Sequence, residues 1–370
     1  MQRFLYDSAP DMELTVLPVD MNTDLPGGLF SDMPVTPAAE YPAPRLEPLC
    51  YPGIRPEHAF TTSEGDVWPV NVVETEEGVR FGVATPEGVF DLNDALRFYG
   101  VAPMEDRFPV VGFGSNACPG QLCEKFSAEQ NSWGDITEEG DHHIVPTLRG
   151  SMRDVAAAYS SKLGIHGYMF AELIEAEGAE TDVFVNFLSA GQLARMIRSE
   201  SAYELCNIGE VTIDGLSQPI TAFGFAGKNP VLLDASGRPI LLESVHTRGT
   251  DMDSMNEVEI LESMAAEFGP SLDEQYPNAP VFANSASNLM AYPSYRVEFL
   301  RRPDTGRLVY KHHPEPGETP DELIGVTFQR ILQAAGRVST DRLLDHLPIE
   351  NRGVAPHTFR ELYETSGKAN

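Results

Sequence analysis

The chain has 370 residues, 42% hydrophobic and 9% aromatic, which is enough to bury a sizeable core in about two or three structural units. Its formal charge is −30, from 26 basic and 56 acidic residues. Such an excess of negative charge repels phosphate backbones and anionic membranes, so it argues against nucleic acid and membrane surfaces as partners. We expect a solvated acidic surface instead.

The composition gives no sign of secretion or membrane insertion. Residues 1–10 lack the basic and apolar regions of a secretory signal, and no apolar run reaches the length of roughly 20 residues that a membrane helix needs. The four cysteines are too few for a disulfide framework in a chain of this length. We therefore expect a cytoplasmic protein.

The first third of the chain divides into an arm and a small β-rich segment. Residues 1–65 are rich in proline and poor in periodic apolar runs, so we expect an irregular arm that either wraps the surface or stays partly disordered. Residues 66–105 alternate apolar and turn residues, which predicts a β-meander with strands at 68–73, 79–83 and 89–92. Asp91 or Asn93 is placed to cap a short helix over 94–98.

Residues 106–250 carry the clearest signals. A strand over 108–111 ends at a glycine turn, and Pro119 suits the first turn of the helix that follows. The further expected elements are strands at 143–148, 167–174 and 181–187 with a turn at 175–178, and hairpins pairing 211–213 with 220–223 and 231–233 with 240–242. These alternating elements favour an α+β domain with a mixed sheet.

The remaining residues give weaker patterns. We expect a mixed extension over 251–314 and a helical segment over 315–370. The helical prediction rests on residues that share a broad face, the apolar ones at 323, 326, 331 and 332 together with Thr327, and on the leucines at 343, 344 and 347. Either terminal extension is a candidate surface for a protein partner.

The turn Gly112-Phe-Gly-Ser-Asn116 is the first candidate site. Its two glycines let the backbone approach a ligand closely and permit positive φ angles. Successive N–H groups at the start of a helix attract anions, and Ser115 and Asn116 add a hydroxyl and an amide without adding charge. The alternative is an ordinary strand-to-helix turn.

A helix with complete capping signals provides the second candidate. Ser189 and Gln192 predict a capping box, and Leu193, Met196 and Ile197 mark the buried stripe. Continuing the stripe by seven positions from Leu193 leads to Glu200, while Arg195 and Arg198 point elsewhere.

A carboxylate on an apolar face is costly unless it is paired or functional. Burial would raise the pKa of Glu200 and suit the group to proton transfer near neutrality. Two plainer interpretations remain open, in which Glu200 lies in solvent at the helix end and Tyr203 is ordinary strand core.

Together, these two elements resemble the γ-glutamylcyclotransferase-like fold. Val111-Gly-Phe-Gly-Ser-Asn116 is similar to the Tyr-Gly-Ser-Asn turn of that family, in which a strand leads into the turn and a helix follows. The family's catalytic glutamate comes at the end of a later short helix with a tyrosine close behind, as Glu200 and Tyr203 do here, 85 residues beyond Ser115 (200 − 115 = 85). The resemblance covers residues 106–230.

The resemblance implies a mixed β-barrel-like sheet with flanking helices. It implies that Glu200 is catalytic and that Phe113, Gly114, Ser115, Asn116 and Tyr203 bind a small-molecule substrate. The reaction would cleave a γ-glutamyl amide, or a related small amide, by intramolecular cyclisation, with no metal or organic cofactor. The alternative function is a non-catalytic protein that retains the fold and binds a small metabolite or a partner.

The sequence departs from the family pattern at two positions. Phe113 stands where the family usually has tyrosine, so that hydroxyl is missing, and Ser201 stands where glycine commonly follows the glutamate.

Other motifs are weaker. Gly112-x-Gly114-x-x-Ala117 fits a relaxed dinucleotide fingerprint, but Pro119 and the polar stretch over 127–141 do not suit the helix that this motif requires. The spacing of Asp251, Asp253 and Glu262 is similar to that of a calcium-binding loop. Met255 and Asn256, however, stand where such a loop needs an oxygen ligand and a glycine, so we expect no calcium site there. We expect the adjacent histidine pairs at 142–143 and 312–313 to be surface pairs rather than metal ligands, and the cysteines at 118 and 123 to be small buried residues.

Overall fold

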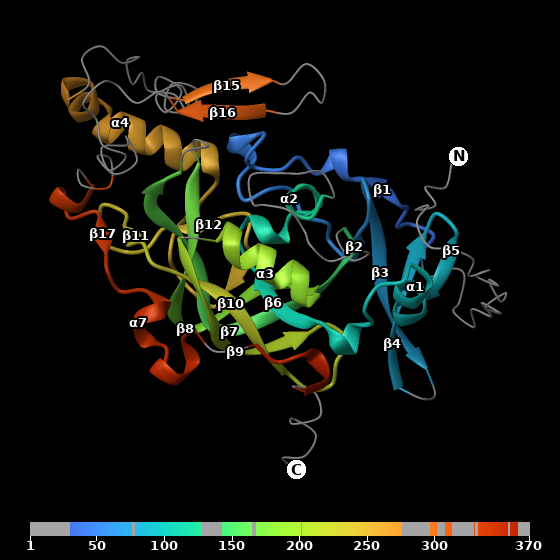
Figure 1. The fold of residues 1–370 in the computed structure, drawn as a ribbon. Helices are drawn as coiled ribbons and strands as arrows, with labels where there is room; N and C mark the ends of the chain where they lie inside the picture. Colours follow the sequence, from blue (N-terminus) through green and yellow to red (C-terminus); the bar gives the residue numbers. More distant parts are fainter. Residues whose placement is uncertain are drawn as a thin grey trace.

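The computed structural model describes residues 30–75, 78–127, 143–164, 168–200, 202–275, 297–301, 308–312, 329, 332–353 and 356–361. At its centre, five strands form a closed barrel (Figure 1). These strands are β6 (Phe108–Gly112), β7 (Val145–Leu163), β8 (Met169–Leu188), β9 (Tyr203–Ile213) and β10 (Ile220–Gly227). The protein is therefore of the α+β class with a barrel-like mixed sheet, as the sequence predicts at this coarse level.

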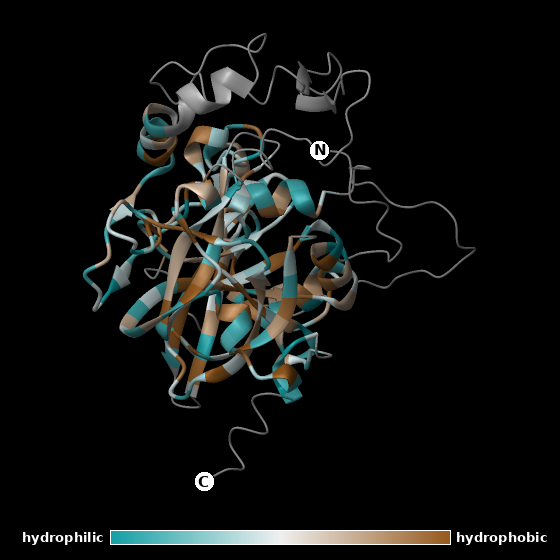
Figure 2. Cartoon of the chain, turned by 90° about the vertical axis from the view of Figure 1, so that its left-hand side faces the viewer, coloured by the Kyte–Doolittle hydropathy of each residue, from teal (hydrophilic) through white to brown (hydrophobic). Residues whose placement is uncertain are grey.

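The barrel follows the order β8–β6–β10–β9–β7 and closes because β7 also pairs with β8. β6 and β10 are parallel, with Val110 opposite Phe223, and the other neighbours are antiparallel. Brown, apolar segments follow the central strands in Figure 2, and buried residues of these strands belong to two large hydrophobic clusters. A closed barrel leaves no edge among its own five strands.

A meander continues the barrel sheet on one side. It consists of β2 (Ala59–Thr62), β3 (Asp66–Thr75), β4 (Gly78–Thr85) and β5 (Gly88–Asp91), and β2 joins it to β7. Asp91 caps the helix α1 (Leu92–Phe98) by accepting from the Asn93 N–H at 2.9 Å, as expected. The sheet thus starts before residue 66 and runs without a break into the barrel.

The predicted turn at 175–178 is wrong, because β8 runs unbroken through it. Gly178 has a φ of +80°, and its N–H donates to Asp154 Oδ1 at 2.8 Å. Asp154 itself has a positive φ of 59°, and the register of β7 against β8 shifts beside it. The glycine therefore serves a local irregularity inside two long paired strands rather than a chain reversal.

Short strands and helices complete the described residues. The second expected hairpin is present: Leu233 and Pro239 form a bridge, and the N–H groups of Asp234 and Ile240 donate to the carbonyl oxygens of Arg238 and Leu232. Its two arms also pair with β7. The remaining elements are β1 (Thr36–Pro37), α2 (Pro119–Lys125), α3 (Ala190–Ser199), β11 (Val231–Leu232), β12 (Leu241–Leu242), β13 (Thr247–Arg248), β14 (Ser254–Met255), α4 (Glu257–Gln275), the pair β15 (Val297–Arg301) and β16 (Leu308–His312), β17 (Val338–Ser339) and α7 (Leu343–His346).

The C-terminal prediction is only partly covered. Leu343 and Leu344 lie in α7 and are buried, whereas residues 323, 326, 327 and 331 lie outside the described residues. Among the helices that the structure describes, none has the length and apolar character needed to cross a bilayer.

The N-terminal arm packs into the molecule instead of only wrapping its surface. Over residues 30–65 it has few regular elements, as expected, but Ala38, Ala43, Tyr51 and Phe60 are buried. The arm also approaches α2 so closely that a Cβ at Gly120 would lie 1.7 Å from the Tyr41 carbonyl oxygen. This contact brings the residues around position 50 beside the glycine turn.

Candidate functional site

The glycine turn lies between β6 and α2, and its shape depends on two close approaches. A Cβ at Gly112 would lie 2.9 Å from the Asn116 carbonyl oxygen, and one at Gly114 would lie 3.3 Å from the Tyr51 hydroxyl. Neither glycine has a positive φ angle, and that of Gly114 is −94°. The glycines therefore serve close packing, and the expected need for positive φ is not what selects them.

Four consecutive N–H groups of the turn, at positions 113–116, have no acceptor in the described part of the chain. The carbonyl groups of Gly114 and Ser115, in contrast, accept from Ala117 and Cys118 at 3.1 and 3.0 Å. A short 3-10 turn over Ser115–Ala117 thus begins with its donors unused. Unused donors at the start of a helical turn form a favourable site for an anion or a developing oxyanion.

A chain of buried polar groups holds the turn in place. Asn186, on β8, donates from Nδ2 to the Asn116 carbonyl at 3.0 Å, and its Oδ1 accepts from the Thr147 hydroxyl at 3.0 Å. Asn186 and Thr147 are both fully buried. Two barrel strands therefore fix the backbone from which the Asn116 side chain projects.

The helix α3 delivers Glu200 to this turn. Its capping box is complete, because the Ser189 hydroxyl accepts from the Gln192 N–H at 3.3 Å and the Gln192 side chain accepts from the Ser189 N–H at 3.0 Å. Glu200 is the residue at its C-terminal end. Asn116 Nδ2 donates to Glu200 Oε1 at 3.0 Å, so the structure brings together the two predicted elements across 84 residues.

The predicted helix face needs a correction. Leu193 and Met196 are buried, but Ile197 is 44% exposed and Arg195 is buried at 1%. Arg195 reaches the Ser127 carbonyl oxygen at 3.3 Å, so it lies on the inner face instead of pointing elsewhere. The buried stripe is rotated toward Arg195, and a long side chain with a polar end occupies it.

Lys125, at the end of α2, is the site residue that the sequence analysis missed. Its ammonium lies 2.6 Å from Glu200 Oε1 and 2.7 Å from Asn116 Oδ1, and its side chain is only 3% exposed. No partner for Glu200 is identifiable from the sequence, whereas in the structure Glu200 forms an ion pair with Lys125. Lysine in the last turn of a helix is also favoured by the helix dipole, so its presence there did not distinguish it.

Glu200 keeps one oxygen unused. Both hydrogen bonds to its carboxylate go to Oε1, and Oε2 accepts none in the described residues. The side chain of Glu200 is 14% exposed. The carboxylate is therefore held firmly by one oxygen while the other is available for a ligand or a proton.

Aromatic residues from the arm and the barrel border the turn. Tyr51 stacks on Tyr168 with ring centroids 4.5 Å apart, and its hydroxyl accepts from the Ala171 N–H at 2.7 Å. Tyr203 donates from its hydroxyl to the Ala171 carbonyl oxygen at 2.7 Å. Tyr51 thus places a phenol next to Gly114, near a turn in which Phe113 carries no hydroxyl of its own.

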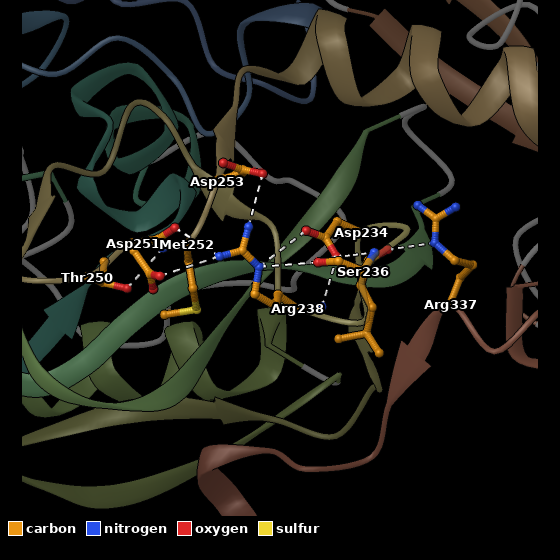
Figure 3. A network of polar contacts seen from close by, with 9 residues as sticks. Asp234, Ser236, Arg238, Thr250, Asp251, Met252, Asp253 and Arg337 are labelled. Atoms are coloured by element: carbon orange, nitrogen blue, oxygen red, sulfur yellow. Dashed lines mark hydrogen bonds and ion pairs between the residues drawn. The ribbon is translucent and has the colours of Figure 1, made fainter.

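The other motifs have structural partners. Asp251 and Asp253 lie 3.6 and 3.4 Å from the Arg238 guanidinium, which also contacts Asp234 (Figure 3). These carboxylates thus surround a cation supplied by the protein itself.

In the part of the chain that the structure describes, no three histidine, cysteine or acidic residues gather as a metal site. Burial raises the pKa of the Cys118 thiol to about 11, consistent with the expected small buried residue.

Comparison of the chain with family models, curated proteins and solved structures finds no match in any of the three.

Proposed function

We propose that this chain is an enzyme of the γ-glutamylcyclotransferase type, with Glu200 as its proton-transfer group. The observation that carries the proposal is the contact between Glu200 and the glycine turn, through the side chain of Asn116. The turn offers unused N–H donors, and Glu200, held through Asn116 and Lys125, presents a free Oε2 beside it. This combination matches what an intramolecular attack on an amide needs, an oxyanion site and one acid–base group.

In the proposed reaction, Glu200 accepts a proton from the α-ammonium of a γ-glutamyl amide. The freed amine attacks the γ-carbonyl carbon of the same molecule, and the turn's N–H groups receive the negative charge that develops on the carbonyl oxygen. Glu200 then gives this proton to the leaving nitrogen as the amide C–N bond breaks, and the second proton of the attacking nitrogen passes through the same carboxylate to the released amine, which leaves protonated. The products are 5-oxoproline and a free amine, and one carboxylate suffices because the attack gains from proximity.

Lys125 and Asn116 have supporting parts in this scheme. The Lys125 ammonium offsets the charge of Glu200 before the proton is accepted, and its contact with Asn116 Oδ1 persists when Glu200 is neutral. Asn116 fixes the carboxylate so that Oε2 and not Oε1 faces the substrate. The same geometry leaves Tyr203 as an anchor of Ala171 in the barrel wall.

A second candidate function is favoured by the ion pair itself. A carboxylate paired with an ammonium 2.6 Å away is a complete arrangement that needs no substrate. In that case, the turn would bind a small metabolite through its N–H groups without chemistry, and Glu200 would only shape the site.

A turnover assay separates the two functions. The protein is incubated with a panel of γ-glutamyl amines and γ-glutamyl dipeptides, and 5-oxoproline is measured by mass spectrometry. We expect turnover by the wild type and a loss of two to four orders of magnitude in kcat for Glu200→Gln, since that is the usual contribution of a general acid–base group. Glu204→Gln, on the neighbouring strand β9, is the matched control and should retain full activity.

The proposal fails if no member of the panel is turned over or if Glu200→Gln is as active as the wild type. Binding of 5-oxoproline without turnover, measured by calorimetry, would instead support the non-catalytic function.

A further inference from the structure

Arg55 reaches the glycine turn from outside the barrel. It lies in the arm just before β2, and its Nη2 donates to the Phe113 carbonyl oxygen at 2.7 Å and to the Gly114 carbonyl oxygen at 3.4 Å. These contacts join residues 58 and 59 positions apart. The guanidinium therefore binds two consecutive peptide groups of the turn at their oxygen ends.

Each of these peptide groups has an unused N–H at its other end. The Phe113 carbonyl shares its planar peptide with the Gly114 N–H, and the Gly114 carbonyl shares its peptide with the Ser115 N–H. Neither N–H has an acceptor in the described residues. A hydrogen bond to a carbonyl oxygen polarises the whole peptide, so a cation there strengthens the N–H as a donor.

The charge of Arg55 has no competing partner nearby. No ion pair or hydrogen bond joins Arg55 to a carboxylate in the part of the chain that the structure describes, and its Nε is buried without a hydrogen-bond partner. Burial lowers the pKa of Arg55 to about 10, which leaves the guanidinium protonated at neutral pH. Its positive charge is therefore directed at the turn.

We propose that Arg55 is a positioning residue that polarises the Gly114 and Ser115 N–H groups for a carbonyl oxygen that acquires negative charge. Its effect on peptide polarisation stands on the contacts alone, and its catalytic consequence rests on the proposed function. The arm thereby supplies a determinant of reactivity that the central domain lacks. The substrate class is that of the proposed function, a carbonyl compound whose oxygen becomes anionic in the reaction.

Nuclear magnetic resonance tests the polarisation without any turnover. The protein is labelled with carbonyl-¹³C phenylalanine and ¹⁵N glycine, so that only the Phe–Gly peptides give correlated signals. The chain has four such pairs, whose glycines are Gly82, Gly114, Gly224 and Gly269. The Gly114 signal is assigned as the one missing from the Gly114→Ala protein, and the other three serve as internal controls.

We expect Arg55→Met to move the Gly114 nitrogen upfield by more than any of the other three glycine signals, because a hydrogen bond to the preceding carbonyl deshields this nitrogen. Arg55→Lys should give an intermediate position, and it keeps the test available if the methionine variant does not fold. Arg45→Met is the matched control, since Arg45 lies on the same arm and pairs with Glu124 on α2 at 2.6 Å. An unmoved Gly114 signal in folded Arg55→Met or Arg55→Lys protein overturns the proposal.

Kinetics then test the catalytic consequence. We expect Arg55→Met to lower kcat about tenfold, a fraction of the loss that follows removal of a whole oxyanion donor, and to leave KM within about twofold. Arg45→Met should change neither constant. A fall in binding with unchanged kcat would overturn the role at the transition state. Absence of turnover by the wild type would defeat the proposed function, while the Gly114 signal would still decide the role of Arg55.

Discussion

Two buried carboxylates in this molecule have opposite surroundings. Glu200, at the end of α3, has an ammonium 2.6 Å away and an amide donor 3.0 Å away. Glu172, on β8, is fully buried, and neither of its carboxylate oxygens accepts a hydrogen bond in the described residues. The free-energy cost of burying a carboxylate is therefore met differently at the two residues, with a cation and an amide donor beside Glu200 and with neither bonded to Glu172.

Packing explains how Glu172 is held. A Cβ at Gly227, on β10, would lie 1.3 Å from Glu172 Oε2, so the carboxyl group occupies space that only a glycine leaves free. Desolvation raises the pKa of Glu172 to about 8, while the neighbouring Asn229 acts in the opposite direction without a hydrogen bond of good geometry. Burial without a matching cation thus favours the neutral acid.

The comparison shows why burial alone does not identify a catalytic carboxylate. Glu172 is the more buried group, yet it lies against packed backbone, and its polar neighbour Asn229 makes no hydrogen bond of good geometry to it. Glu200 is less buried, is hydrogen-bonded to the side chain of Asn116 in the turn with the four unused N–H groups, and retains a free oxygen. A site is indicated by the combination of a held group, a free atom and complementary donors, and the predictions below test each half of this contrast.

The largest effect should come from removing the cation beside Glu200. Lys125→Met leaves the carboxylate with only Asn116, and breaking a buried ion pair from one side costs roughly 3 to 5 kcal/mol. We expect this loss in the free energy of unfolding measured by urea denaturation at pH 7. The double variant Lys125→Met/Glu200→Gln should recover most of it, because no uncompensated charge remains.

A Lys125→Met protein as stable as the wild type would mean that the ion pair contributes little. Glu200 would then be hydrated through its exposed edge, and the contrast with Glu172 would rest on the position of the two groups alone.

A smaller effect, with a definite pH dependence, should follow from Glu172→Gln. The pKa of Glu172 is raised in the folded protein to about 8 from 4.5, so the folded state binds more protons than the unfolded state between these values. The stabilising difference is fully present below about pH 4.5 and is lost as pH rises through about 8. Glutamine cannot ionise, so the variant should gain roughly 3 kcal/mol on the wild type between about pH 4.5 and pH 7.

Unfolding is measured for both proteins from pH 5 to pH 9. A constant difference between them over that range would show that Glu172 does not change protonation on folding. Glu177→Gln, an exposed position further along the same strand, is the control and should show no such trend.

The sequence was sufficient for elements whose signals are local. The capping box at Ser189, the cap at Asp91 and the strand–turn–helix unit around Gly112 all depend on residues within a few positions of one another, and all are present. The meeting of Glu200 with the turn was reached through the family resemblance. Helix periodicity alone placed Ile197 and Arg195 on the wrong faces.

What the sequence did not predict depends on contacts between distant residues. Lys125, Arg55 and Tyr51 reach the site from α2 and from a proline-rich arm without periodicity, so no local pattern marks them. The prediction of a turn at Gly178 was wrong for the same reason. The pairing of β8 with β7 keeps the strand continuous there, although the local sequence is typical of a chain reversal. Long-range pairing decides such positions, and propensity is only a weak guide to them.

The smallest effect concerns Tyr203, which lies between the two carboxylates. Desolvation and the charges of neighbouring groups, Glu172 and Glu200 among them, raise the pKa of Tyr203 well above its usual value, so its hydroxyl remains a donor. That donor is used on the Ala171 carbonyl oxygen at 2.7 Å, one residue before Glu172. Tyr203→Phe should therefore lower the free energy of unfolding by about 1 kcal/mol, the usual net value of such a bond.

The same variant distinguishes an anchor from a substrate contact. If Tyr203 only holds the barrel wall, kcat and KM with a γ-glutamyl amide should stay within about twofold of the wild type, because removing uniform binding energy would raise KM. Tyr99→Phe, which loses a hydroxyl contact with Glu87 in the meander, is the control for removing a phenol elsewhere. A large rise in KM for Tyr203→Phe alone would return this residue to the substrate-binding set and would place the substrate beside the Ala171 carbonyl group.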